Sequence, residues 1–258
     1  MYSILEHYLS TNHILMIGMI VTFILTFFLL EHPFSFLPSD QGRAFAVNGS
    51  LSKGKLRGVG FIFVLCFLIS SVLFLPIDVE YVIYAILLFA MMISGYLDDA
   101  SKTPWNEYKK GLIDLVISIV AVLTYMNFNS TTICFGADEI VIPKALFLIL
   151  GVILIWVSVN VTNCTDGVDG LCASLCSVTL LAFGVLFAPI LQKYAMANFL
   201  FLSVLFAYLY FNSSPSSMLM GDAGSRALGF YIAVIALKST HPFIYILLAA
   251  VMIVDGGI

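Results

Sequence analysis

Aspartate residues gather in three short polar segments of a chain that is otherwise largely apolar. Asp98 and Asp99 lie in the first segment, Asp166 and Asp169 in the second, and Asp222 in the third. Adjacent carboxylates repel each other unless a cation or a hydrogen-bond donor lies between them, so Asp98 and Asp99 favour a functional site over a solvated helix end. Mg²⁺ prefers oxygen ligands and commonly shares phosphate oxygens with one or two protein carboxylates. The three segments therefore predict a cation site for phosphate chemistry.

The second and third segments each allow a structural as well as a functional interpretation. Asp166 and Asp169 are spaced to share one face of a helix, and Gly167 would let a ligand approach the backbone. The same two acids could instead complement the dipole of a helix N-terminus. Asp222 stands among small residues, where it could cap a helix or hold a metal beside N–H groups that bind an anion. Asn212 is a turn residue on the first interpretation and a ligand contact on the second.

The composition places these segments in a membrane protein. The 258 residues are 61% hydrophobic and 10% charged, whereas a soluble domain is about half apolar and about a quarter charged. The chain cannot hide so much apolar surface from water, so we predict an all-α polytopic membrane protein. Its apolar runs predict about nine transmembrane helices, near residues 13–30, 58–76, 80–97, 111–127, 143–159, 169–188, 196–211, 226–237 and 242–258.

The links between these runs alternate sides and place all three acidic segments on the same side. That side, formed by links 31–57, 98–110, 160–168 and 212–226, holds eight basic residues against three on the other. The positive-inside rule then makes it cytoplasmic and puts the N-terminus outside. The eight are Arg43, Lys53, Lys55, Arg57, Lys102, Lys109, Lys110 and Arg226, and the three are Lys144, Lys193 and Lys238.

The chain shows no sign of a second domain. We expect one transmembrane helical domain over residues 1–258, with the four cytoplasmic links as active-site loops. Two short runs around Gly136-Ala137-Asp138 predict a β-hairpin near 130–142 on the outer face.

Basic residues on the cytoplasmic side suggest how a phosphate substrate could be held. Lys53 lies in a Gly-Lys stretch that reflects either positive-inside bias alone or contact with a pyrophosphate. If the site moves a phosphosugar from a nucleotide diphosphate to a lipid phosphate, Asp222 and one of the adjacent carboxylates could ligate Mg²⁺ while Lys102 adds positive charge. A phosphate monoester has a second pKa of about 6 and is mostly dianionic at neutral pH. We therefore expect Asp98 to position the lipid phosphate more than to remove a proton.

Taken together, three motifs resemble the polyprenyl-phosphate N-acetylhexosamine-1-phosphate transferase superfamily. Asp98, Asp99 and Lys102 match its DDxxK motif, residues 160–171 match NxTNxTDGxDGL, and residues 211–229 match FNxxP…MGDxGSxALG. The likeness runs from about residue 40 to the end and is greatest to the bacterial MraY family, the phospho-N-acetylmuramoyl-pentapeptide transferases.

The resemblance implies a reaction and its partners. Phospho-MurNAc-pentapeptide would pass from its UDP carrier to undecaprenyl phosphate, giving lipid I and UMP for peptidoglycan synthesis at the bacterial inner membrane. It also implies Mg²⁺ with Asp222 as ligand, a homodimer, and no nucleic acid. Asp98 and Asp99 would lie at the lipid-phosphate end as catalytic residues with Asp222. The implied substrate-binding residues are Lys53, Lys102, Asn163, Asp166, Gly167, Val168, Asp169, Asn212 and Leu219, those from Asp166 to Asp169 lying with Asn212 around the uridine.

The sequence departs from the family pattern in two places. Leu219 stands where the family usually has an aromatic residue that can stack on uracil. The family also follows its ninth span with a histidine-bearing loop and a tenth span, so we expect this sequence to be part of a longer protein.

Two alternative functions would use the same carboxylates. A WecA-like enzyme would transfer GlcNAc-1-phosphate to the same lipid. A cation transporter is disfavoured because transporter carboxylates tend to lie near the bilayer midplane, not in loops at one face.

Overall fold

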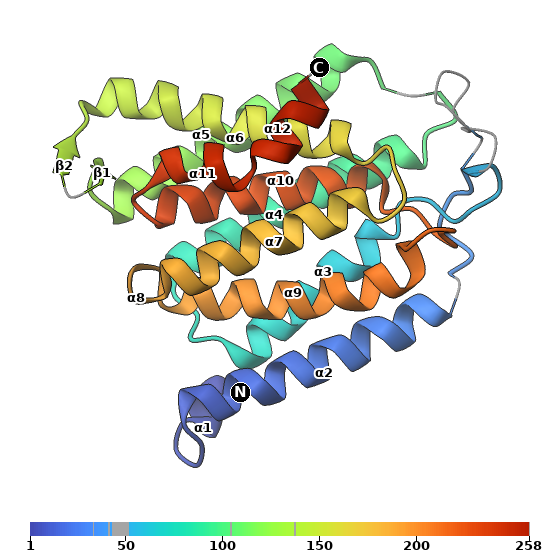
Figure 1. Cartoon of the computed structure of the whole chain (residues 1–258), viewed down its shortest axis with the longest axis horizontal. Helices are drawn as coiled ribbons and strands as arrows, with labels where there is room; N and C mark the ends of the chain where they lie inside the picture. The colour runs from blue at the N-terminus through green and yellow to red at the C-terminus, as the bar shows by residue number, and fades with distance from the viewer. Residues whose placement is uncertain (33, 41, 43–51, 104, 137, 258) are drawn as a thin grey trace.

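Helices make up most of the structure, a computed structural model that describes residues 1–258 except 33, 41, 43–51, 104, 137 and 258 (Figure 1). Arg43 of the predicted first link therefore lies outside the described residues. In chain order the elements are α1 (Tyr2–Leu5), α2 (Thr11–Glu31), α3 (Gly60–Phe74), α4 (Val79–Asp99), α5 (Glu107–Phe128), β1 (Thr132–Phe135), β2 (Asp138–Val141), α6 (Lys144–Thr165), α7 (Leu171–Leu186), α8 (Ala188–Leu191), α9 (Lys193–Asn212), α10 (Gly221–Lys238), α11 (Pro242–Leu248) and α12 (Ala250–Gly257).

Five of the described helices are long and apolar enough to cross a membrane: α2, α4, α5, α6 and α9. Helices α3 and α7 are also apolar but shorter. The chain is thus a multi-pass helical membrane protein, while nine spans and an outer N-terminus stay predictions. Helix α10 forms the centre of the bundle, because every residue from Gly221 to Leu237 is buried and its main neighbours are α4 and α6.

The predicted single helix over 242–258 is wrong, because the structure divides it into α11 and α12. The break falls at Ala249 (φ −99°, ψ 11°), which is buried. Alanine favours helices, so the local sequence gives no signal for the break. At the break the chain packs against α7, where the Thr179 hydroxyl, which donates to the Leu175 carbonyl at 2.9 Å, also lies 3.2 Å from the Leu248 carbonyl oxygen.

Close backbone contacts bring two helices onto the start of α10. A Cβ atom at Gly60 of α3 would lie 2.1 Å from the Gly224 nitrogen, and one at Gly95 of α4 would lie 2.3 Å from the Asp222 carbonyl oxygen. Small residues allow such approach between membrane helices. The C-terminus of α4 and the N-terminus of α10, both of which carry predicted site residues, are therefore held in contact.

The predicted hairpin is confirmed. Strands β1 and β2 pair antiparallel, with Thr132 opposite Val141 and Phe135 opposite Asp138. Ala137 of the predicted turn lies outside the described residues. The hairpin and the start of α10 lie at opposite ends of the bundle (Figure 1).

We expect Gly95→Ala to destabilise the protein by about 2 kcal/mol or more, because neither backbone can move away without repacking. The measurement is thermal unfolding in detergent. Gly111→Ala on α5 is the matched control, since its Cβ would meet nothing closer than 3.8 Å. Equal melting temperatures for the two variants would contradict the close-packing argument.

Candidate active site

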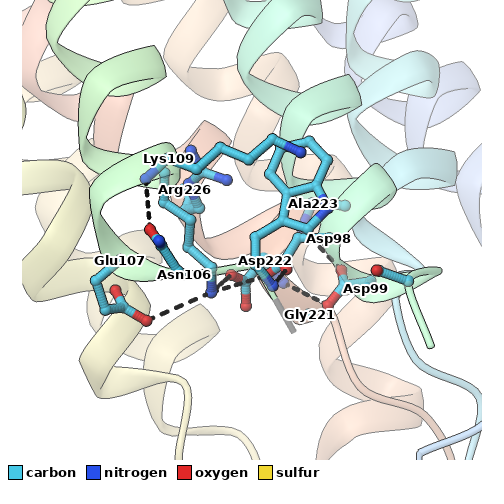
Figure 2. Close-up of polar contacts among 12 residues, drawn as sticks. Asp98, Asp99, Asn106, Glu107, Lys109, Gly221, Asp222, Ala223 and Arg226 are labelled. Atoms are coloured by element: carbon cyan, nitrogen blue, oxygen red, sulfur yellow. Dashed lines mark hydrogen bonds and ion pairs between the residues drawn. The ribbon is translucent and has the colours of Figure 1, made fainter. Parts of the chain in front are cut away.

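The carboxylates of the first and third acidic segments meet where the end of α4 faces the start of α10. Figure 2 shows Asp98 and Asp99 lying beside Gly221, Asp222 and Ala223. The side chains of Asp98, Asp99 and Asp222 are 4%, 0% and 10% exposed. Buried charges of one sign require partners, so the contacts of each carboxylate decide what the site can do.

Asp99 caps helix α10 from another helix. Its carboxylate accepts the backbone N–H groups of Asp222 at 3.2 Å and Ala223 at 3.0 Å. These N–H groups begin the helix and have no partner within it, so an anion here also benefits from the helix dipole. Gly221 has φ +66°, and a Cβ there would lie 2.3 Å from an Asp99 oxygen. The cap therefore requires both the carboxylate and the glycine.

Asp222 lies between two cations that hold it loosely. One oxygen is 3.1 Å from Lys110 Nζ and the other is 3.4 Å from Arg57 Nη2. Both distances exceed the roughly 2.7–2.9 Å of a strong charge-assisted hydrogen bond. Of the three carboxylates, Asp222 is the most exposed and the least tightly bonded, so it is the one most available to a ligand.

The two cations also bind the other carboxylates. Lys110 Nζ lies 2.7 Å from Asp98, which accepts the Trp105 N–H at 2.6 Å. Arg57 Nε donates to Asp99 at 2.8 Å, and its Nη1 lies 3.5 Å from Asp40. Partial burial alone would lower the pKa of Arg57, but the neighbouring carboxylates hold it above its ordinary value. Arg57 thus stays charged at the centre of the site.

A second cluster joins the second and third acidic segments. Asp169 accepts the Ser216 N–H at 2.9 Å and its hydroxyl at 2.7 Å, and Lys55 Nζ lies 3.7 Å away. Burial would raise the pKa of Asp169, yet the Ser216 bonds and Lys55 hold it below its ordinary value. Asn212 accepts the Gly170 N–H at 3.0 Å and donates to the Met218 carbonyl. These bonds give Asn212 a structural role in fixing the two loops.

The other predicted residues lie outside these clusters. Lys53, Lys102, Gly167 and Val168 are exposed, and the two lysines make no ion pair with any residue that the structure describes. Asn163 and Asp166 are half-buried at the end of α6, where the Asp166 N–H donates to the Asn163 carbonyl. Leu219 is 9% exposed and its backbone pairs with Leu56, so its side chain offers no open stacking face.

Sequence reasoning missed the importance of four charged residues. Lys110 and Arg226 counted only toward the assignment of the cytoplasmic side, Arg57 counted otherwise only as one of several basic residues in a link that could contact phosphate, and Asp114 was not considered. Asp114 forms a buried ion pair with Arg226, 3% and 2% exposed. A signal was available, because an ionisable residue inside an apolar run such as 111–127 is expected to be paired or functional.

Comparison with known proteins identifies the family. A model of glycosyl transferase family 4 matches residues 81–240, which contain Asp98, Asp99 and Asp222. The chain belongs to glycosyl transferase family 4. A relative in Treponema pallidum, named phospho-N-acetylmuramoyl-pentapeptide-transferase, is 35% identical over 263 residues, covering 93% of this chain and 72% of the relative.

Relatives with the same name occur in other bacteria. Those of Dictyoglomus turgidum and Halalkalibacterium halodurans are 25% and 28% identical; the matches cover 95% of this chain and 80% and 81% of the relatives. The resemblance to MraY within the superfamily is thereby confirmed. As a family 4 member with apolar helices, the chain is a membrane-embedded phosphoglycosyl transferase of peptidoglycan synthesis.

The contacts of Asp169 predict a pH-dependent stability. Because its folded-state pKa is lowered, its contribution is present above the unfolded pKa of about 3.9 and is lost as pH falls through the folded value. Asp169→Asn should therefore melt below the wild type at pH 7, and the gap should shrink as pH falls below about 4. Thermal unfolding between neutral and acid pH tests this, with Asp138→Asn in the exposed hairpin as control. A gap that stays constant into acid would contradict it.

Proposed function

We propose that this chain transfers phospho-MurNAc-pentapeptide from UDP-MurNAc-pentapeptide to undecaprenyl phosphate, releasing UMP and forming lipid I. The observation that carries the proposal is the group of three carboxylates, Asp98, Asp99 and Asp222, held by two cations at one end of an apolar bundle. The printed names of the relatives support the sugar. The excess of basic residues on the loops supports a site on the cytoplasmic side of the inner membrane. By family analogy the enzyme acts as a homodimer.

The charges around Asp222 fit a divalent cation. Six carboxylates, those of Asp40, Asp98, Asp99, Glu107, Asp114 and Asp222, share three cations in the described network, namely Arg57, Lys110 and Arg226, so negative charge is in excess there. The donors are all oxygens, as Mg²⁺ prefers. Asp222 would hold the ion, since the other carboxylates are committed to closer contacts. Bound Mg²⁺ would offset the repulsion between two anionic substrates and stabilise the leaving nucleotide phosphate.

Four further charged side chains have roles in the proposed reaction. Asp99 fixes the start of α10 and so sets the place of Asp222. Lys110 and Arg57 bind Asp222 only loosely and can turn toward phosphate oxygens. Asp98 orients the lipid phosphate, which is already a dianion and needs little proton removal. The exposed apolar faces of the helices keep the polyprenyl chain in the bilayer beside the site.

UMP release by the purified chain tests the proposal, with UDP-MurNAc-pentapeptide, undecaprenyl phosphate and Mg²⁺. We expect Mg²⁺-dependent release that falls at least about 100-fold in Asp222→Asn and is unchanged in Asp138→Asn. A parallel reaction with UDP-GlcNAc separates the WecA-like alternative. Release with UDP-GlcNAc alone would reject the proposed sugar, and release in the presence of a chelator would reject the role of the metal.

The role assigned to Asp98 predicts a particular pH profile. Asp98→Asn should slow transfer about 100-fold, as misplacement of a reacting group can, and the loss should persist well above pH 8. Initial rates of UMP release from neutral to alkaline pH provide the measurement. Recovery of the variant at high pH would instead identify Asp98 as a general base.

A further inference from the structure

A second ion pair lies directly behind the proposed metal ligand. Arg226 follows Asp222 by one turn of α10, and Asp114 follows Lys110 by one turn of α5. Two ion pairs therefore join α5 and α10. In the outer rung, Lys110 Nζ of α5 contacts Asp222 of α10; in the inner rung, Asp114 of α5 contacts Arg226 Nη2 of α10, so the cation and the anion have exchanged helices. The outer rung is 17% and 10% exposed, the inner rung only 2% and 3%.

Burying the inner rung costs desolvation free energy, so the pair calls for a functional explanation. Replacing a buried ion pair by apolar residues is often neutral or stabilising, so such a pair is weak evidence for stability. Arg226 is among the largest fully buried side chains, and its Nε and Nη1 have no hydrogen-bond partner in the described part of the chain. Its guanidinium therefore has unused donors one turn from Asp222.

Each member of the inner rung can compete for a member of the outer rung: Asp114 for Lys110, and Arg226 for Asp222. On a helix, side chains four residues apart are neighbours, so Asp114 can reach Lys110 and Arg226 can reach Asp222. The contact between Asp114 and Arg226 prevents both of these alternative ion pairs. We infer that the Arg226–Asp114 pair is a positioning pair, which keeps Lys110 on Asp98 and Asp222 and keeps a third cation away from the metal ligand. This inference rests on the proposed function.

The inference predicts opposite effects for its two halves. In Arg226→Met, the unpaired Asp114 draws Lys110 away, which leaves Asp222 more negative. Mn²⁺ should then bind more tightly, while the KM for UDP-MurNAc-pentapeptide rises about tenfold because a charged contact to the substrate is lost. In Asp114→Asn, the released Arg226 turns to Asp222. Mn²⁺ should bind about tenfold more weakly, and more Mg²⁺ should be needed for half-maximal rate.

The experiment is a titration of the purified full chain with Mn²⁺, followed by electron paramagnetic resonance, alongside the KM measurements. The double variant Asp114→Asn/Arg226→Met should return both quantities to near wild-type values, and Arg226→Lys, which keeps the charge, should resemble wild type. Glu80→Gln is the matched control, because it breaks the buried pair with Lys238 at the other end of α4 and α10. It should lower the melting temperature without changing Mn²⁺ affinity.

Several outcomes would overturn the inference. They are shifts of Mn²⁺ affinity in the same direction for both single variants, no shift for either, or no recovery in the double variant. Wild-type UMP release with none of the predicted shifts rejects the positioning role alone. The predicted Mn²⁺ shifts without any UMP release reject the proposed reaction alone, and a wild type that binds no Mn²⁺ counts against both. If a single variant does not fold, the double variant and Arg226→Lys still decide.

Discussion

The start of helix α10 depends on a carboxylate supplied by another helix. Asp99 accepts two of its first N–H groups, and the glycines at 95 and 221 let the backbones come close enough for that contact. Without the cap, buried N–H groups would lack partners beside an apolar bundle. The position of Asp222 follows directly, since it is the second residue of the same helix. The chemistry of the site therefore rests on a contact between two backbones.

The same cations serve the folded site and, in the proposed reaction, its substrate. Arg57 and Lys110 neutralise carboxylates that would otherwise repel one another in a poorly solvated place. Their contacts to Asp222 are long, so little interaction is lost when they move to a phosphate. A site of this kind needs no large rearrangement to accept an anion, because the positive charge is already there.

The sequence predicted what depends on residue type and spacing, and missed what depends on distant packing. The helical class, the hairpin and the gathering of Asp98, Asp99 and Asp222 at one end followed from hydropathy, turn residues and alternation of the links. Arg57 could not be placed, because a loop side chain finds its partners only once three elements are packed. The bonds of Asn212 to Gly170 and Met218 depend on the packing of two loops, which residue spacing does not give, and its contact with a ligand stays a prediction. The break in the helix at Ala249 was missed for the same reason, because the local sequence gives no signal for it.

Helix α10 is not among the helices that qualify as spans by hydropathy, although it forms the centre of the bundle. It carries three charged residues, Asp222 in its first turn, Arg226 one turn further on and Lys238 in its last turn, and charged residues lower the tendency of an isolated helix to insert into a bilayer. Its charges find partners on α4 and α5, which are synthesised first. Because α4 and α5 precede α10 in the chain, the side chains that pair with the charges of the active-site helix are synthesised before it emerges.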